Sequence, residues 1–283
     1  MATLIYGLEE ITDRYDGFII DLFGVIHNGI KLYPQTIDTL TRLQELGKAV
    51  CFLSNSPRLA EDAGDQCLQM GLPQNLLPPI VTSGEASHKA LEEFGARYGK
   101  NCWFISSGMP ELHSITQNVD ITFLDGPEGA DFILNSIPGT ETTEKEKLLA
   151  QFGYASECGL PMICANPDLV VHIGDTLHEC AGTFAKIYEE IGGDVTYFGK
   201  PYLPVYEAAQ QQLGGLAKDR ICAIGDSFHT DIQGANNFGI DSLFNLVGIH
   251  REELGSGNIE TGLQDLINKQ AHKPVYVIEG FKW

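Results

Sequence analysis

The sequence predicts an α/β fold organised around a doubly wound parallel sheet. Short apolar runs bounded by turn residues recur along the chain, as expected of strands buried on both faces of such a sheet. Helical patterns lie between these runs, so strands and helices alternate. The clearest run, at 18–20, is followed at once by a single carboxylate, Asp21. Because α/β sheets bind ligands at the carboxyl ends of their strands, Asp21 is a candidate nucleophile or metal ligand; capping of a turn is the alternative.

The composition is that of an acidic globular protein. The 283 residues include 18 Lys and Arg against 38 Asp and Glu, a formal net charge of −20. This charge argues against nucleic acid or an anionic membrane as a partner, whereas a small phosphorylated substrate needs only local positive charge or a metal. Seven scattered cysteines without a C-x-x-C pair, together with the lack of a signal peptide or membrane-spanning stretch, predict a cytoplasmic protein.

The first third of the chain alternates strand and helix. Beyond the strand at 18–20, the predicted elements are helices at 33–46 and 58–70 and strands at 49–53 and 80–83. The first of these helices ends at Gly47 and has its leucines on one face. This order predicts parallel strands with right-handed connections.

The middle of the chain starts the alternation afresh. Its predicted elements are helices at 85–98, 143–157 and 179–191 and strands at 102–106, 131–135 and 162–164. The segment is long enough to form a small α/β domain of its own. We therefore expect a core domain of residues 1–84 and 197–283, with residues 85–196 inserted as a second domain.

The last third returns to the pattern of the core. Strands are predicted at 195–198, 221–224 and 241–247, a helix at 202–213, a surface helix at 260–269 and a final edge strand at 275–278. The segment 225–235 passes from a strand end into a helix and carries two carboxylates.

Polar side chains follow four of the predicted strands: Asp21, Ser54 with Asn55, Lys200, and Asp226 with Asp231. These strand ends open on one rim of a parallel sheet. Carboxylates there favour Mg²⁺, which takes few protein oxygens and keeps waters and substrate phosphate as its other ligands. Lys200 can balance Asp21 and a phosphate, and the Ser54 hydroxyl can donate to a phosphate oxygen. An aspartate in such a site can form an aspartyl phosphate.

These residues resemble the motifs of the haloacid dehalogenase (HAD) superfamily and, within it, the class IIA, NagD-like hydrolases. The resemblance covers essentially the whole chain. The four motifs look like residues 21–25 (Asp-Leu-Phe-Gly-Val), 53–55 (Leu-Ser-Asn), 199–201 (Gly-Lys-Pro) and 225–235, which begins Gly-Asp. Residues 82–86 and 165–168 are similar to segments typical of class IIA. The resemblance implies a HAD-like core with an α/β cap, residues 85–196, inserted between the second and third motifs.

The resemblance also implies an activity: Mg²⁺-dependent removal of phosphate from a small phosphorylated metabolite, such as a sugar phosphate. Asp21 would be the nucleophile and would bind Mg²⁺ together with Asp226 and the main-chain carbonyl of Phe23. Asp231 would support the metal through water or hold Lys200.

Substrate binding is implied in the same way. Ser54, Asn55 and Lys200 would bind the transferring phosphoryl group, and Asn166 and Asp168 would face the substrate from the cap, with a plain turn as the alternative for these two residues. Class IIA relatives pair through their caps, so a homodimer is an expected form.

One position departs from the motifs. The family's phosphatases carry a second Asp two residues after the nucleophile, which protonates the leaving group and later activates water; here that residue is Phe23. Loss of general acid–base help commonly costs about 10²–10⁴-fold in rate. The metal ligand is retained, because a main-chain carbonyl does not depend on the side chain.

Three alternatives follow from Phe23. Another residue can supply the proton. His27 and His229 both lie near the predicted rim, and the unperturbed pKa of histidine suits proton transfer. The substrate can have a leaving group that needs no protonation, such as an acyl or aryl phosphate, or the chemistry can be that of HAD enzymes that cleave carbon–halogen or carbon–phosphorus bonds. Finally, the protein can be a catalytically weak HAD-fold protein that binds a phosphorylated ligand and has a regulatory role.

Overall fold

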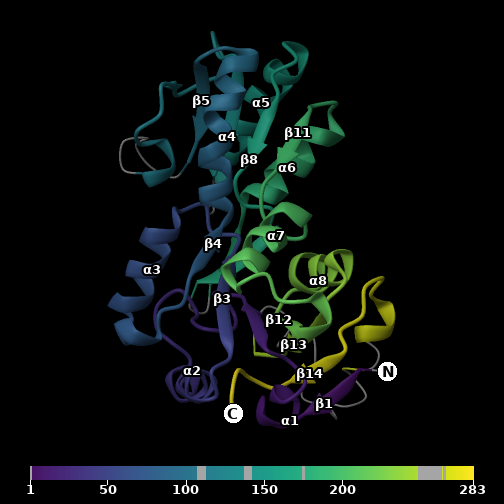
Figure 1. Cartoon of the computed structure of the whole chain (residues 1–283). Helices are drawn as coiled ribbons and strands as arrows, with labels where there is room; N and C mark the ends of the chain where they lie inside the picture. Colours follow the sequence, from purple (N-terminus) through teal and green to yellow (C-terminus); the bar gives the residue numbers. More distant parts are fainter. Residues whose placement is uncertain (1, 107–112, 137–141, 174–175, 248–262, 264–265) are drawn as a thin grey trace.

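Two parallel sheets, one in each of two lobes, form the framework of the molecule (Figure 1). The computed structural model describes residues 2–106, 113–136, 142–173, 176–247, 263 and 266–283. The lower lobe in this view holds both termini and a seven-stranded sheet, and the upper lobe holds a five-stranded sheet. Every strand pairing within these two sheets is parallel. The predicted α/β core with an inserted α/β cap is therefore confirmed.

The lower sheet has the strand order β1-β14-β13-β12-β2-β3-β4. Its strands are β1 (Thr3–Ile5), β2 (Gly17–Ile20), β3 (Ala49–Ser54), β4 (Ile80–Thr82), β12 (Ile221–Gly225), β13 (Asp241–Asn245) and β14 (Tyr276–Ile278). The α-helices of this lobe are α1 (Glu9–Thr12), α2 (Thr36–Glu45), α3 (Ala60–Gln69), α7 (Leu203–Gln212) and α8 (Gln233–Phe238). Among the described residues, no helix combines the length and apolarity needed to cross a membrane.

The side chains of β2 explain why helices cover both faces of this sheet. Phe18 and Ile20 pack into one apolar cluster with Leu40 of α2. Ile19 points to the opposite face, because side chains alternate along a strand, and packs into a second cluster with Tyr206 of α7. All four residues of the strand are buried, so its apolar run reflects burial on both faces.

The upper sheet has the strand order β11-β8-β7-β5-β6. Its strands are β5 (Asn101–Ile105), β6 (Thr122–Leu124), β7 (Phe132–Asn135), β8 (Met162–Cys164) and β11 (Val195–Tyr197), and its helices are α4 (Ser83–Tyr98), α5 (Thr142–Glu157) and α6 (Ala181–Glu190). An antiparallel hairpin of β9 (Val170–Ile173) and β10 (Thr176–Glu179), which we did not predict, follows β8.

The structure corrects the prediction for the last strand. The predicted edge strand at 275–278 is β14, which lies inside the sheet between β13 and β1. The unpredicted strand β1 forms the edge instead. Its three residues are too few to show a periodic pattern, and it is defined by pairing with a strand at the other end of the chain.

The predicted division into a core of residues 1–84 and 197–283 and a cap of residues 85–196 stays a prediction. α4 begins at Ser83 and β11 ends at Tyr197, so both connections between the sheets lie close to the predicted boundaries. Of the predicted helix at 260–269, residues 263 and 266–269 are described and are helical, and the other residues lie outside the described part of the chain.

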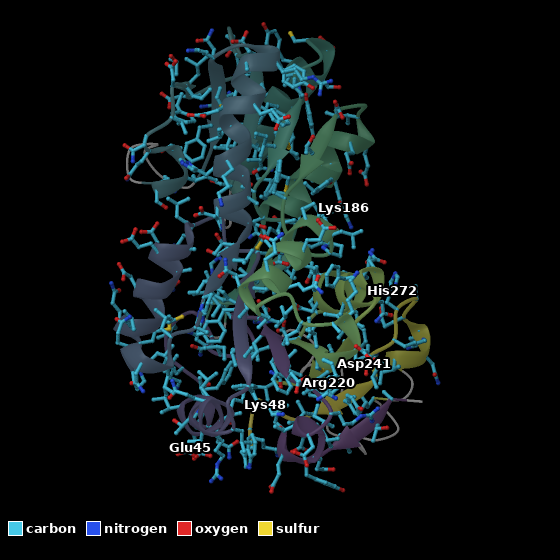
Figure 2. All side chains as sticks on the ribbon, viewed as in Figure 1. Glu45, Lys48, Lys186, Arg220, Asp241 and His272 are labelled. Carbon is cyan, nitrogen blue, oxygen red and sulfur yellow. The ribbon has the colours of Figure 1, made fainter. Side chains whose placement is uncertain are left out.

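Paired polar groups close the amino ends of the core strands, far from the upper lobe (Figure 2). Arg220, before β12, forms two hydrogen bonds of 2.8 Å with the Asp16 carboxylate. The Tyr15 hydroxyl donates to Asp241 at 2.5 Å, and Lys48 donates to the Tyr15 carbonyl at 2.8 Å. The opposite, carboxyl ends of the strands face the upper lobe.

Candidate active site

Asp21 lies directly after β2, in the middle of the lower sheet. Its backbone N–H donates to the Ile224 carbonyl of β12 at 2.9 Å, so the residue extends the pairing by one position. The residue is 7 % exposed, and its Oδ1 accepts a hydrogen bond of 2.8 Å from the Leu22 N–H. The sheet therefore holds this carboxylate at the rim that faces the upper lobe.

Lys200 binds two carboxylates at once. Its Nζ lies 2.7 Å from Asp21 Oδ1 and 2.8 Å from Asp231 Oδ1, and the residue is buried. Burial lowers the pKa of a lysine, but the charges of Asp21 and Asp231, with smaller contributions from Asp168 and Tyr206, outweigh that effect and raise the pKa of Lys200 well above its usual value. Lys200 is therefore a constant positive charge beside Asp21.

The backbone before Lys200 leaves no space for a side chain. Gly199 has φ +125°, and a Cβ on this residue would collide with Ser83 Oγ and Asn55 Oδ1. The Ser83 hydroxyl donates to the Phe198 carbonyl at 2.5 Å. The connection from β11 to Lys200 is thus held against the first turn of α4, which explains the glycine before this lysine.

Three carboxylates meet beside this lysine. One oxygen from each of Asp21, Asp226 and Asp231 lies within 4.8 Å of the others. A Cβ on Gly24 would collide with the Asp226 carboxylate, so the chain after Asp21 reaches the cluster only because residue 24 is glycine. Burial raises the pKa of Asp21, and the other two carboxylates add to this effect despite the opposing charge of Lys200. The cluster carries more negative charge than one ammonium offsets, so this set of oxygen donors fits a hard divalent cation such as Mg²⁺.

The second motif lies at the end of β3. Ser54 Oγ accepts a hydrogen bond of 3.1 Å from the Ser56 N–H. The Asn55 side chain accepts from the Lys200 N–H at 2.7 Å and donates to the Lys200 carbonyl at 3.1 Å and to Asp168 Oδ1 at 2.8 Å. The Asn55 amide is therefore occupied by contacts that hold Lys200 and Asp168 in place.

A cavity of about 660 Å³ opens above these groups, between the two lobes. Its floor contains Asp21, Phe23, Ser54 and Asn55. Its other walls include polar residues of and around α3 and residues of the upper lobe, among them Arg58, Asp62, Asp65, Gln66, His113, Ser136, Asn166, Asp168, Val171, Ile173 and Cys180. The volume is typical of a site for a small molecule.

Phe23 forms an apolar part of the cavity wall. Its ring packs edge-on against the His27 ring, with centroids 4.5 Å apart. His27 is 1 % exposed, and its Nδ1 accepts from the Gly29 N–H at 3.0 Å. Burial and the charge of Arg58 lower the pKa of His27 to about 4. His27 is thus neutral near pH 7 and does not line the cavity described above; its predicted role as a substitute acid stays a prediction that this environment disfavours.

His229 lies in a different place. It is exposed and lines a second cavity of about 390 Å³, together with Tyr197, Tyr202 and Lys186. Figure 2 shows Lys186 near the boundary between the lobes. The cavity that contains Asp21 is not lined by His229. Its predicted role as a substitute acid also stays a prediction.

Asn166 and Asp168 lie in the loop after β8 and both line the larger cavity. Asn166 Oδ1 accepts from the Asp168 N–H at 3.0 Å, which closes a turn of the Asx type. The two alternatives for this segment, a turn and a substrate-facing loop, are thus compatible.

Several residues of the cavity wall were absent from the predicted site. Arg58 and His113 carried no motif. Val171 and Ile173 belong to the hairpin β9–β10, and the Gly-Asp dipeptide at 174–175, which follows a largely apolar segment, was the available signal for that hairpin. A pattern of strand ends could not identify these positions, because they approach Asp21 only through the packing of the lobes.

Known proteins share this architecture. A family model described as haloacid dehalogenase-like hydrolase matches residues 18–122, and one described as HAD-hydrolase-like matches residues 197–282. The 5'-nucleotidase YutF of Bacillus subtilis is 25% identical over 249 residues, which cover 87% of this chain and 93% of that protein. Phosphoglycolate phosphatase 1A of Arabidopsis thaliana is 25% identical over 88% of this chain and 74% of its own length. The crystal structure of a haloacid dehalogenase-like hydrolase from Brucella suis has a TM-score of 0.81 and 29% identity, covering 98% of this chain and 99% of that chain.

The fold and the site define a capped α/β hydrolase with a buried aspartate, a lysine and a carboxylate cluster at the junction of its lobes. The chain belongs to the haloacid dehalogenase-like hydrolases, in the class IIA, NagD-like subgroup, and is an enzyme of the phosphatase type. The family predicted from the four motifs is confirmed.

Proposed function

We propose that this enzyme hydrolyses phosphate esters of small metabolites, such as sugar phosphates, in a Mg²⁺-dependent reaction that passes through a phosphoryl group on Asp21. The observation that carries the proposal is the ion pair of 2.7 Å between Lys200 and Asp21, on the floor of a ligand-sized cavity. A buried carboxylate beside a constant positive charge suits the transfer of an anionic group. The named activities of the relatives, a nucleotidase and a phosphoglycolate phosphatase, support a small phosphate ester as the substrate.

The metal site would consist of Asp21, Asp226 and the main-chain carbonyl of Phe23, with Asp231 supporting it while holding Lys200. A bound Mg²⁺ supplies positive charge that offsets the charge on the phosphoryl oxygens. The uncompensated charge of the carboxylate cluster is the feature of this chain that favours such an ion.

Each side chain of the site has its own role in the proposed reaction. An Asp21 oxygen attacks phosphorus while the bond to the leaving oxygen breaks, and water then hydrolyses the acyl phosphate. Lys200 neutralises the transferring group and the Ser54 hydroxyl donates to it. Asn55 contributes through its main chain and by orienting Lys200, because its amide is already occupied. Asn166 and Asp168 contact the substrate from the upper lobe.

Phe23 favours a second candidate function, binding of a phosphorylated ligand without efficient turnover. An apolar ring cannot exchange a proton at the position where related phosphatases carry their acid. The buried Asp21–Lys200 pair and the carboxylate cluster favour the enzyme, because binding of an anion alone does not require a nucleophile or three acidic groups beside it. The predictions of a cytoplasmic protein, of pairing through the caps and of no nucleic-acid or membrane partner stay predictions.

Phosphate release from acetyl phosphate, 4-nitrophenyl phosphate and glucose 6-phosphate tests the proposal. We expect release that requires Mg²⁺, stops with EDTA and is lost in Asp21→Asn. Asp120→Asn is the matched control, because Asp120 is an exposed carboxylate of the upper lobe. If no ester gives Asp21-dependent release while the protein binds phosphorylated ligands, the binding function replaces the phosphatase. Activity on the activated phosphates alone would indicate phosphoryl transfer without an efficient acid.

A further inference from the structure

The cavity above Asp21 contains few groups that can exchange a proton with a leaving group. Among the described residues that line it, these are Asp62, Asp65, His113, Asp168 and Cys180. Asp62 and Asp65 belong to α3, at the side wall of the cavity. Burial raises the pKa of the Cys180 thiol, which makes it a poor source of protons. His113 packs against the Phe104 ring, with centroids 5.2 Å apart, and burial together with Arg58 lowers its pKa, so it is mostly uncharged.

Asp168 has the direct structural link to the reacting groups. Its Oδ1 accepts from Asn55 Nδ2 at 2.8 Å, and the same amide binds both main-chain polar groups of Lys200. Lys200 in turn contacts Asp21 at 2.7 Å. Asp168 is half-buried and lines the cavity, and the charge of Lys200 acts on its carboxyl group.

The loop that carries Asp168 is held on two sides. Asn166 Oδ1 accepts from the Asp168 N–H, and the Asp168 carbonyl accepts from the Gly182 N–H of α6 at 3.2 Å. A Cβ on Gly182 would collide with the carbonyls of Pro167 and Asp168, so the first turn of α6 packs directly on this loop. The position of the carboxyl group is therefore set by the upper lobe and does not depend on a long flexible side chain.

The surroundings of Asp168 favour the protonated form more than water does. Burial raises its pKa, and the charge of Asp231 adds to this; Lys200 and the hydrogen bonds from Asn55 and Thr230 act in the opposite direction but do not cancel it. The thiols of Cys164 and Cys180 also lie near it. Asp168 lines the second cavity as well, whose titratable side chains are Lys186, Glu189, Tyr197, Tyr202 and His229. A carboxyl group with a raised pKa can hold a proton nearer to neutral pH, as a general acid requires.

We propose that Asp168 is the general acid and base of this enzyme, in place of the residue that Phe23 has replaced. The inference rests on the proposed phosphatase function. In the first step the protonated Asp168 gives its proton to the leaving oxygen as Asp21 forms its bond to phosphorus. In the second step the Asp168 carboxylate takes a proton from water, whose oxygen attacks the phosphorus of the acyl phosphate. Phosphate leaves, Asp21 is freed as a carboxylate, and Asp168 is protonated again.

The test compares Asp168→Asn with the wild type on three esters of rising leaving-group basicity: 4-nitrophenyl phosphate, phenyl phosphate and glycerol phosphate. We expect kcat/KM on glycerol phosphate to fall by about 10²–10⁴-fold, and by only a few-fold on 4-nitrophenyl phosphate, because nitrophenolate leaves without a proton. Asn keeps an oxygen that accepts from Asn55, so the contact between the lobes is retained. With 4-nitrophenyl phosphate, the variant should release a burst of nitrophenol and accumulate phosphorylated protein, detectable by intact mass, because water is no longer activated.

Several outcomes would overturn the inference. An equal loss on all three esters without phosphorylated protein would make Asp168 a positioning residue only. A selective loss in His113→Gln, with none in Asp168→Asn, would transfer the role to His113. No phosphate release by the wild type, or release that is unchanged in Asp21→Asn, would instead reject the proposed function itself. Asp65→Asn, on the same cavity, is the control and should show no selectivity for the leaving group.

The pH dependence of kcat/KM gives a second measurement, which uses the wild type alone and does not depend on whether a variant folds. In the wild type, kcat/KM on glycerol phosphate should fall as pH rises through the pKa of the acid, while kcat/KM on 4-nitrophenyl phosphate should not show this limb. The same descending limb on both esters would contradict the proposal.

Discussion

Asn55 of the lower lobe and Asp168 of the upper lobe are joined by a hydrogen bond of 2.8 Å. The oxygen of the same amide accepts from the Lys200 N–H at 2.7 Å. One uncharged side chain thus links the upper lobe to the backbone of the lysine that contacts Asp21. Because its partner at Nδ2 is a carboxylate, this position requires a donor as well as an acceptor.

Replacing the donor by a carboxylate tests this relationship. Asn55→Asp places a second acid beside Asp168, and we expect it to lower the free energy of unfolding by about 1–3 kcal/mol near neutral pH. The two acids raise each other's pKa in the folded state, so the folded protein binds more protons than the unfolded one, and the deficit should shrink as pH falls. Urea denaturation at several pH values measures this effect. Asn55→Ala, which adds no charge, should show a deficit with little change with pH; identical pH profiles for the two variants would contradict the explanation.

Lys200 should be essential for stability as well as for turnover. Lys200→Met leaves Asp21 and Asp231 buried without their shared cation, so we expect a loss of about 3–5 kcal/mol in the free energy of unfolding, measured by denaturation in EDTA. Lys100→Met is the matched control. Its partner Asp120 is 85% exposed in its side chain, and Lys100 itself is 60% exposed, so removing this surface pair should cost about 0–1 kcal/mol. Similar losses in both variants would mean that Asp21 and Asp231 do not need the charge of Lys200 for the stability of the folded protein.

Gly24 should be required for the metal site. Gly24 has φ +80°, and Gly24→Ala would drive a methyl group into the Asp226 carboxylate. We expect Mg²⁺ at a concentration of 100 times Kd to stabilise the wild type by about 2.7 kcal/mol in thermal denaturation, and this variant to lose that stabilisation. Gly47→Ala is the control, since Gly47 has φ +66° but nothing within 4 Å of its added Cβ. It should cost about 1–2 kcal/mol from the left-handed conformation and keep its response to Mg²⁺. A normal response in Gly24→Ala would place the ion elsewhere.

His27 should make the protein less stable in acid. Its pKa is about 4 in the folded protein because of burial and Arg58, whereas an exposed histidine titrates near its usual, higher value. As pH falls through that higher value, the unfolded state therefore binds a proton that the folded state does not, and stability should decrease by up to about 3 kcal/mol as pH 4 is approached. His27→Asn, which keeps an acceptor for the Gly29 N–H, should flatten the stability profile between these values.

Exposed His229 provides the control for this pH profile. A change of slope in His27→Asn that is absent in His229→Gln, which removes an exposed imidazole, would assign the effect to the buried His27 ring. An unchanged slope in His27→Asn would show that the pKa of His27 does not differ between the folded and unfolded states. It would return His27 to the candidates for a substitute acid.

The residues with the strongest local signals were the ones that sequence reasoning identified. Asp21 and Asp226 follow neighbouring strands of one parallel sheet, so their convergence at one rim follows from the geometry of that sheet. The expectation was wrong for Lys200, because the strand before it, β11, belongs to the sheet of the upper lobe. Lys200 reaches Asp21 through the packing of the two lobes. The strand β1 and the wall residue Arg58 could not be identified in this way, since neither has a periodic pattern or a motif.

The sequence by itself determined the alternation of strands and helices and the residues that carry charge at the strand ends, because both depend on local composition and on the geometry common to parallel sheets. Only the tertiary structure decided that His27 is buried behind Phe23, that the Asn55 amide is occupied, and that Asp168 reaches the cavity from the other lobe. These features depend on contacts between segments far apart in the chain. Burial at such contacts determines which hydrogen bonds form and which groups hold a proton.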